Sequence, residues 1–118
     1  MFKHWNRNRL GSVAKRTACQ DHFHHSREEA ACCRMLSLKK LAGELQEIRR
    51  QVTFNLNVNG KKITSHRVDF FVQYKTGLWE AVEYKGFATE IWNLKRKLFE
   101  AVYPEIPYRV MTKKDLPK

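Results

Sequence analysis

The feature that most constrains the fold is a run of alternating apolar and polar residues over positions 50–58. Side chains of a strand point alternately to its two faces, so the apolar residues of this run would share one face. They are Val52, Phe54, Leu56 and Val58, whereas Thr53, Asn55 and Asn57 would lie on the opposite face. The run therefore predicts a half-buried strand.

Two turn signals extend this strand into a sheet. Asn59-Gly60 follows the run directly and is the preferred dipeptide of two-residue hairpin turns. Thr76-Gly77 marks a second turn. Strands over residues 62–74 and 78–85 would each pair with the strand before them. The sequence thus predicts a three-stranded antiparallel meander.

A helix is predicted before these strands, over residues 26–42. Ser26 is a favourable N-cap, Glu29 completes a capping box, and Gly43 is a suitable C-cap. Its apolar stripe would consist of Ala31, Met35, Leu38 and Ala42. Residues 44–49 are expected to connect this helix to the first strand.

A second helix is predicted after the meander, over residues 89–103, with Thr89 as its N-cap. Its apolar stripe would be Ile91, Leu94, Leu98 and Val102. Pro104 and Pro107 would end the helix, because proline lacks the backbone N–H that a helix requires. Residues 108–111 favour a short final strand.

The chain has 118 residues, the size of one ordinary domain, and its sequence shows no internal repeat. The order of elements predicts an α+β fold. Residues 1–25 would form a basic N-terminal arm without regular structure, residues 26–112 the folded domain, and residues 113–118 a polar, frayed tail.

The charge balance points to a polyanionic partner. The chain carries 23 Lys and Arg against 12 Asp and Glu, a formal net charge of +11. Such an excess is typical of nucleic-acid-binding proteins, although a basic soluble protein or one that sits on anionic lipid would also show it. Because no apolar run approaches the roughly 20 residues of a membrane helix and the basic N-terminus lacks a signal-peptide core, we expect a cytoplasmic protein that does not enter membranes.

The arm offers two interpretations of equal weight. It is rich in cations, with Trp5 and Phe23 interleaved, and its cationic residues include Arg7, Arg9, Lys15 and Arg16. These residues would either form a disordered basic tail or contact phosphates while the aromatic rings stack on bases.

The strongest chemical signal lies in two of the predicted strands. Asp69 is flanked by apolar residues, and Glu83 and Lys85 would point to the same face because they are two residues apart. Carboxylates that face each other across strands can bind a divalent cation, with the backbone carbonyl of Tyr84 as a further ligand. A structural ion pair between Asp69 and Lys85 is the competing interpretation, because a buried carboxylate requires a cationic partner.

Four motifs occur in a characteristic order: Ser26-Arg27-Glu28-Glu29-Ala30, Val68-Asp69-Phe70, Val82-Glu83-Tyr84-Lys85-Gly86 and Leu94-Lys95-Arg96-Lys97-Leu98-Phe99. This order resembles the PD-(D/E)XK nuclease superfamily. Over about residues 20–112 the chain is similar to a small phage-associated family within it, of endonucleases resembling Holliday-junction resolvases and known mainly as a domain of unknown function. One position departs from the superfamily pattern, because Val68 stands where a proline often precedes the aspartate.

The resemblance implies a restriction-endonuclease-like core, in which a mixed sheet of about four strands lies between the two helices. It implies that Asp69 and Glu83 bind Mg²⁺ or Mn²⁺, that Lys85 is the catalytic lysine, and that Glu29 completes the site, either directly or through water. The implied activity is hydrolysis of DNA phosphodiester bonds, by nicking or by cleavage of both strands or of a junction, and the chain could act as a homodimer. Glu29 also has a simpler interpretation as a capping residue. We favour it over Glu28 because it shares a helix face with Cys33 and Leu36.

Further candidates surround these residues. The second helix carries Lys95, Arg96 and Lys97 beside Trp92, and His66 and Arg67 precede Asp69. We expect the helix cations to bind phosphate, although charge runs are usually solvated. His66 could carry a proton near neutral pH or contact DNA, but an exposed strand residue is slightly preferred.

A cluster of cysteine and histidine residues suggests an alternative site. Cys19 and His22 have the spacing of zinc ligands, and His25 or Cys32 could complete a structural zinc site. The competing interpretation, which we prefer, is that Cys32 and Cys33 pack as small apolar residues and that the histidines, His24 included, are exposed or contact DNA. Two other functions therefore remain beside the nuclease: a non-catalytic nucleic-acid-binding module of the same fold and a zinc-stabilised adaptor.

Overall fold

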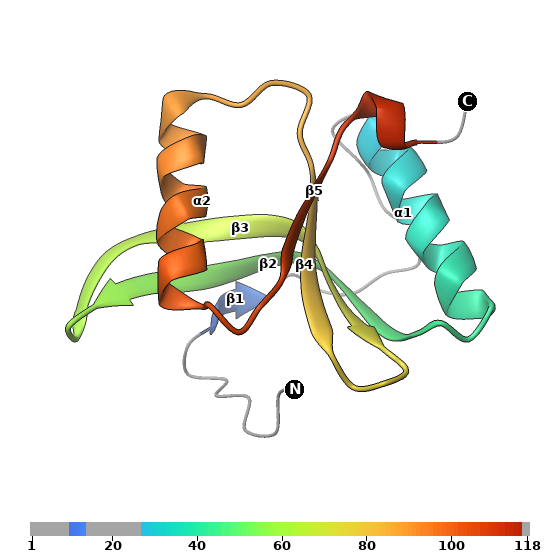
Figure 1. Ribbon diagram of the computed structural model, residues 1–118, viewed down its shortest axis with the longest axis horizontal. Helices are drawn as coiled ribbons and strands as arrows, with labels where there is room; N and C mark the ends of the chain where they lie inside the picture. Colours follow the sequence, from blue (N-terminus) through green and yellow to red (C-terminus); the bar gives the residue numbers. More distant parts are fainter. Residues whose placement is uncertain (1–9, 14–26, 117–118) are drawn as a thin grey trace.

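The computed structural model describes residues 10–13 and 27–116 of the chain, and for residues 10–13 only the backbone. The elements follow in the order β1 (Leu10–Val13), α1 (Arg27–Leu41), β2 (Leu45–Val58), β3 (Lys61–Tyr74), β4 (Trp79–Tyr84), α2 (Glu90–Val102), β5 (Tyr108–Met111) and the 3₁₀ helix η3 (Lys113–Asp115). This is the expected α+β fold, with one helix before and one after the central hairpin (Figure 1).

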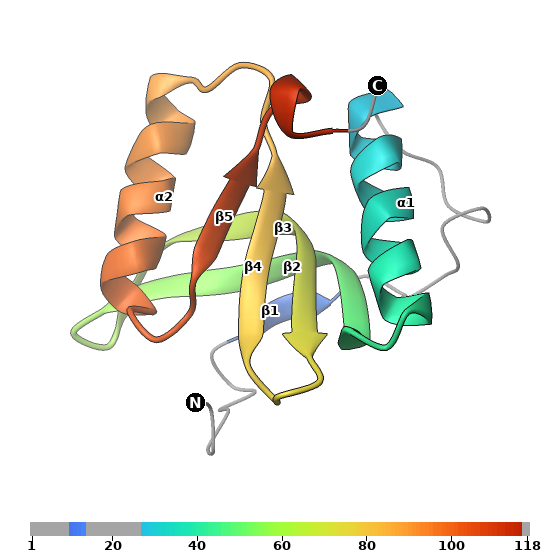
Figure 2. The same ribbon diagram turned by 45° about the vertical axis from the view of Figure 1, so that its right-hand side comes forward.

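The described strands form one mixed sheet in the order β1-β2-β3-β4-β5. β1 to β4 pair antiparallel, which confirms the meander, and β5 pairs parallel to β4. Figure 2 shows β4 and β5 side by side, with α2 and α1 to either side of them. Asn59 and Gly60 have φ of 51° and 79°, so they form the expected type of hairpin turn.

Three boundaries differ from expectation. The sheet has a fifth strand because β1 lies within the arm that was expected to be irregular. Residues 44–49 are not a connector, since β2 begins at Leu45, and Leu45 and Ile48 are both buried. The expected tail forms η3, with Leu116 packed against the core. Tertiary burial decides these segments, and their short local patterns do not reveal it.

The expected apolar stripes of both helices are wrong in part. In α1 the buried residues are Glu29, Cys32, Cys33 and Leu36, whereas Leu38 is 66% exposed. In α2 the buried residue is Phe99, whereas Ile91 and Leu94 are 70% and 67% exposed. In α2 the aromatic ring of Phe99 meets the sheet, whereas in α1 the small side chains of Cys32 and Cys33 meet it together with Leu36.

The core consists of two clusters on opposite faces of the sheet. The α2 cluster includes Phe99 and the α1 cluster includes Leu36. Ala81 and Val82 are neighbours in β4, yet Ala81 belongs to the α2 cluster and Val82 to the α1 cluster. Since consecutive residues of a strand point to opposite faces, the two clusters lie on the two faces of β4.

The strand β2 changes the face that it buries at Gln51. Ile48 lies in the α1 cluster, whereas Val52 and Phe54 lie in the α2 cluster, although even-numbered residues of a regular strand would share one face. Gln51 lies between them with φ of 54°, in the left-handed region. For a residue other than glycine this conformation costs about 1–2 kcal/mol.

The neighbouring strand β3 also changes the face on which its even-numbered residues are buried, at the position opposite Gln51. Phe70 and Val72 pack in the α1 cluster, whereas Val68 packs in the α2 cluster. The ladder pairs Arg50 with Phe70 and Val52 with Val68, which leaves Gln51 opposite Asp69. The bend of the sheet therefore passes through this pair of residues.

Replacing Phe99 by alanine tests the corrected face of α2. The Phe99 ring is fully buried, and its centroid lies 5.0 Å from that of Phe54 and 5.1 Å from that of Tyr103. We expect Phe99→Ala to lower the free energy of unfolding by about 3–5 kcal/mol. Leu94→Ala, on the exposed edge of the same helix, should lower it by less than about 1 kcal/mol. Urea unfolding measures both, and equal losses would contradict the assignment of the two faces.

Candidate functional site

A pocket of about 370 Å³ opens beside the bend of the sheet. It draws residues from both helices and two strands, and it is lined by Glu29, His66, Arg67, Asp69, Glu83, Tyr84, Lys85, Thr89, Ile91, Trp92 and Lys95. The four residues expected to form a catalytic site, Glu29, Asp69, Glu83 and Lys85, therefore all line one pocket.

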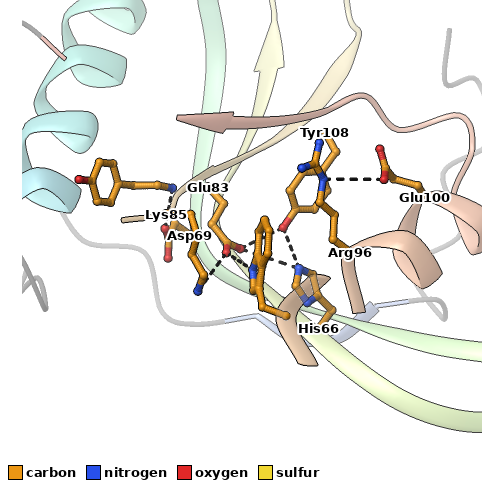
Figure 3. A network of polar contacts seen from close by, with 9 residues as sticks. His66, Asp69, Glu83, Lys85, Arg96, Glu100 and Tyr108 are labelled. Atoms are coloured by element: carbon orange, nitrogen blue, oxygen red, sulfur yellow. Dashed lines mark hydrogen bonds and ion pairs between the residues drawn. The ribbon is translucent and has the colours of Figure 1, made fainter. Parts of the chain in front are cut away.

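Glu83 is the most tightly held of the acidic residues in this pocket, with 4% of its surface exposed. Trp92 Nε1 donates a hydrogen bond of 2.5 Å to Oε2, and the Tyr108 hydroxyl donates one of 3.0 Å to Oε1 (Figure 3). Burial raises the pKa of Glu83, and these two hydrogen bonds act in the opposite direction. The carboxylate is thus fixed in orientation through both of its oxygens.

Asp69 accepts a hydrogen bond of 3.0 Å from the backbone N–H of Tyr84. Burial, together with the negative charges of Glu29 and Glu83, raises the pKa of Asp69 to about 7. The expected alternative, an ion pair between Asp69 and Lys85, does not form. The Lys85 ammonium instead lies 3.8 Å from Glu83 Oε2. The Tyr84 carbonyl as a metal ligand stays a prediction.

Glu29 comes from the first turn of α1 and is 8% exposed. The Gln51 side-chain amide donates a hydrogen bond of 3.3 Å to its Oε2. Glu29 lies on the buried face of α1 with Cys33 and Leu36, as expected. The capping box depends on Ser26, which lies outside the described residues.

The carboxylates of Glu29, Asp69 and Glu83 line an open pocket and are not arranged as a preformed set of metal ligands. Among residues 27–116, no set of three or more His, Cys, Asp and Glu side chains is arranged to hold a metal ion. The donors that line the pocket are nevertheless hard carboxylate oxygens, and repulsion from Glu29 and Glu83 adds to burial in raising the pKa of Asp69. A cation held by one or two of them together with water would fit this donor set.

His66 differs from expectation. It is 4% exposed, and its Nε2 lies 2.7 Å from the Tyr108 hydroxyl. Since that hydroxyl donates to Glu83, Nε2 must carry the proton and donate to Tyr108. Burial and the positive charges of Lys95 and Lys85 lower the pKa of His66 to about 4. His66 is therefore neither the exposed strand residue nor the proton carrier near neutral pH that the sequence suggested.

Two residues of the site, Tyr108 and Gln51, are not predicted by any sequence pattern. Tyr108 reaches Glu83 because β5 pairs parallel to β4, and a crossover of this kind leaves no local signal. Gln51 occupies an ordinary polar position of an alternating strand. Its left-handed φ could not be predicted, because the residue is neither glycine nor asparagine, the residues that usually indicate this conformation.

The cations of α2 point in different directions. Lys95 lines the pocket, and Lys97 is exposed to solvent. The Arg96 guanidinium lies over the rings of Trp92 and Tyr108, at 5.8 and 5.5 Å, and pairs with Glu100 at 3.7 Å. On β3, Arg67 is exposed and lines the pocket.

The remaining candidates lie partly beyond the described residues. Arg7, Arg9, Lys15 and Arg16 are among these, as are Cys19, His22, His24 and His25. Cys32 and Cys33 are fully buried in the α1 cluster, which confirms that they pack as small apolar residues. Burial raises the pKa of Cys32 to about 12, and its Sγ lies 3.5 Å from Met111 Sδ.

Comparison with known proteins assigns the chain to a family. Residues 11–115 match the family model described as "Protein of unknown function (DUF1064)", and the chain belongs to this family. No curated protein and no solved structure matched the chain. In the part of the chain that the structure describes, neither helix is long and apolar enough to span a bilayer.

Replacing Asp69 by asparagine tests the electrostatic strain of the pocket. Because the pKa of Asp69 is higher in the folded protein, about 7, than its ordinary value of 3.8, ionisation of Asp69 destabilises the fold as pH rises between these values. Without divalent ions, Asp69→Asn should therefore raise the free energy of unfolding by roughly 1–4 kcal/mol at pH 8 and leave it nearly unchanged near pH 4. Thermal unfolding across this range measures the effect, and a destabilised variant at pH 8 would contradict it.

Proposed function

We propose that this protein is a metal-dependent DNA endonuclease of the PD-(D/E)XK type, which hydrolyses phosphodiester bonds with Mg²⁺ or Mn²⁺. The observation that carries the proposal is the convergence in one pocket of Asp69 from β3, Glu83 from β4, Lys85 directly after β4, and Glu29 from α1. Three carboxylates and a lysine in a partly buried pocket would hold a cation and a phosphate together.

The metal would be held mainly by Asp69 and Glu83, with the Tyr84 carbonyl as a further ligand and Glu29 acting through water. Mg²⁺ commonly keeps several waters and uses only one or two carboxylates, so the proposal needs no preformed cage. A bound divalent ion supplies charge neutralisation at the phosphate and lowers the pKa of water.

The residues of the chain itself supply orientation and charge. The Lys85 side chain is 30% exposed, and its ammonium lies over the Trp92 ring at 5.1 Å. From this position it would bind a non-bridging phosphate oxygen or orient the attacking water. The hydrogen bonds from Trp92 and Tyr108 keep Glu83 in one orientation during the reaction.

The substrate would be gripped by cations around the pocket. Lys95 and Arg67 line it and would bind the phosphates that flank the scissile bond. The net charge of +11 favours a polyanionic substrate and predicts strongly salt-dependent binding. A homodimer would bring two pockets to the two strands of a duplex or junction, whereas a monomer would nick. The resemblance to a phage-associated family suggests a role in phage or mobile-element DNA.

A second function remains open because of one observation. The carboxylates are not arranged as a preformed three-ligand metal group within residues 27–116. This favours, as the alternative, a non-catalytic nucleic-acid-binding module of the same fold. In that case the basic surface would bind DNA without cutting it.

Cleavage assays test the proposed function. Supercoiled, linear and four-way-junction DNA would be incubated with the protein and Mn²⁺, beside Asp69→Asn and Lys85→Ala. We expect cleavage by the wild type and a loss of roughly 100-fold or more in each variant, because each removes charge that the transition state requires. Lys40→Ala is the charge-matched control, since Lys40 is exposed at the end of α1 and does not line the pocket.

The outcomes separate the two functions. Full activity in both variants would place the active site elsewhere and contradict the proposal. Salt-sensitive DNA binding that persists in Lys85→Ala, without cleavage in Mn²⁺ by either protein, would favour the binding module.

A further inference from the structure

Two consecutive residues of β2 contact the same face of α1. Arg50 Nε donates to Cys33 Sγ at 3.4 Å, and Gln51 Nε2 donates to Glu29 Oε2 at 3.3 Å. Glu29 and Cys33 are four residues apart and both buried, so they lie one turn apart on one face of the helix. In a regular strand Arg50 and Gln51 would point to opposite faces of the sheet, and only one of them could reach this helix face.

The left-handed backbone of Gln51 accounts for the second contact. With φ of 54°, the chain turns at this residue, and its side chain meets α1 beside that of Arg50. Residues other than glycine, asparagine and aspartate rarely adopt this conformation, and such strain tends to persist at functional sites. Glycine would relieve the backbone here but would carry no side chain for Glu29.

The chemistry of an amide suits a carboxylate that must stay available to a cation. A glutamine N–H orients a carboxylate oxygen by hydrogen bonding without neutralising its charge, whereas lysine or arginine would compete with the cation. The neighbouring guanidinium of Arg50 is directed to the Cys33 sulfur and not to Glu29 in this contact. Gln51 also lies opposite Asp69 across the β2–β3 ladder, between the pairs Arg50–Phe70 and Val52–Val68.

We infer that Gln51 is a positioning residue, which holds the Glu29 carboxylate at the pocket so that it acts through water on the cation bound by Asp69 and Glu83. This inference rests on the proposed function, because it assigns Glu29 a role toward the metal. The left-handed backbone at Gln51 has two consequences. It changes the face on which β2 buries its side chains, and it places the Gln51 side-chain amide within hydrogen-bond distance of Glu29.

The test replaces Gln51 by glycine, which removes the amide and relaxes the backbone. We expect Gln51→Gly to unfold at the same or a higher temperature than the wild type. The Mn²⁺ concentration that half-saturates the protein, measured by titration calorimetry, should nevertheless rise roughly 10- to 100-fold, and DNA cleavage should fall by a similar factor. Gln51→Asn, which tolerates the left-handed conformation and keeps an amide, should recover part of the loss.

Two controls separate positioning from a general effect. Asn59→Gly relaxes the other left-handed non-glycine residue of the described chain, at the hairpin turn, and should leave Mn²⁺ binding unchanged. In a Glu29→Gln background, Gln51→Gly should cause no further loss of Mn²⁺ affinity, because the two residues would act through one contact.

A wild type that binds Mn²⁺ and cleaves DNA, with Gln51→Gly indistinguishable from it, overturns this inference alone. A loss that is undiminished in the Glu29→Gln background overturns it as well. A wild type that neither binds Mn²⁺ nor cleaves DNA overturns both this inference and the proposed function.

Discussion

The structure depends on a face switch at the point where Gln51 and Asp69 lie opposite each other. On one side of this pair the even-numbered residues Ile48, Phe70 and Val72 pack in the α1 cluster, and on the other side Val52 and Val68 pack in the α2 cluster. In a regular strand the even-numbered side chains would all stay on one face and would pack in only one of the two clusters. Because the switch interrupts the regular pattern in the middle of the sheet, a polar residue can be placed there between two apolar clusters. Asp69 occupies this position, and the pocket opens beside it.

The electrostatics of the pocket follow from this placement. Burial beside Glu29 and Glu83 makes ionised Asp69 unfavourable, so the pKa of its carboxyl lies near 7. Hydrogen bonds offset part of the cost of burying these charges: the Tyr84 backbone N–H donates to Asp69, and Trp92 and Tyr108 donate to Glu83. Lys85 supplies a positive charge at 3.8 Å from Glu83. A site that concentrates negative charge in this way is stabilised by a cation, which is the physical basis for proposing a metal-dependent reaction.

Much of the framework could be predicted from the sequence. The alternation of 50–58 and the Asn59-Gly60 turn are local signals, and they correctly predict the hairpin. The motif order correctly places Glu29, Asp69, Glu83 and Lys85 at one pocket. The failures concern long-range packing: Ile91 and Leu94 look like a core stripe but are exposed, because α2 instead buries the larger ring of Phe99. The contact between Tyr108 and Glu83 arises from parallel pairing of β5 with β4, and the left-handed φ of Gln51 arises from the face switch. Neither has a local signature.

We propose that the carboxylates of Asp69 and Glu83 share one divalent cation. The most direct test is anomalous diffraction from crystals of the protein soaked in Mn²⁺. We expect an anomalous peak between the two carboxylates, at about 2.0–2.6 Å from an oxygen of each, the range of carboxylate bonds to hard divalent cations. A fully soaked crystal with no peak in this pocket, or with its Mn²⁺ bound at another site, would contradict it.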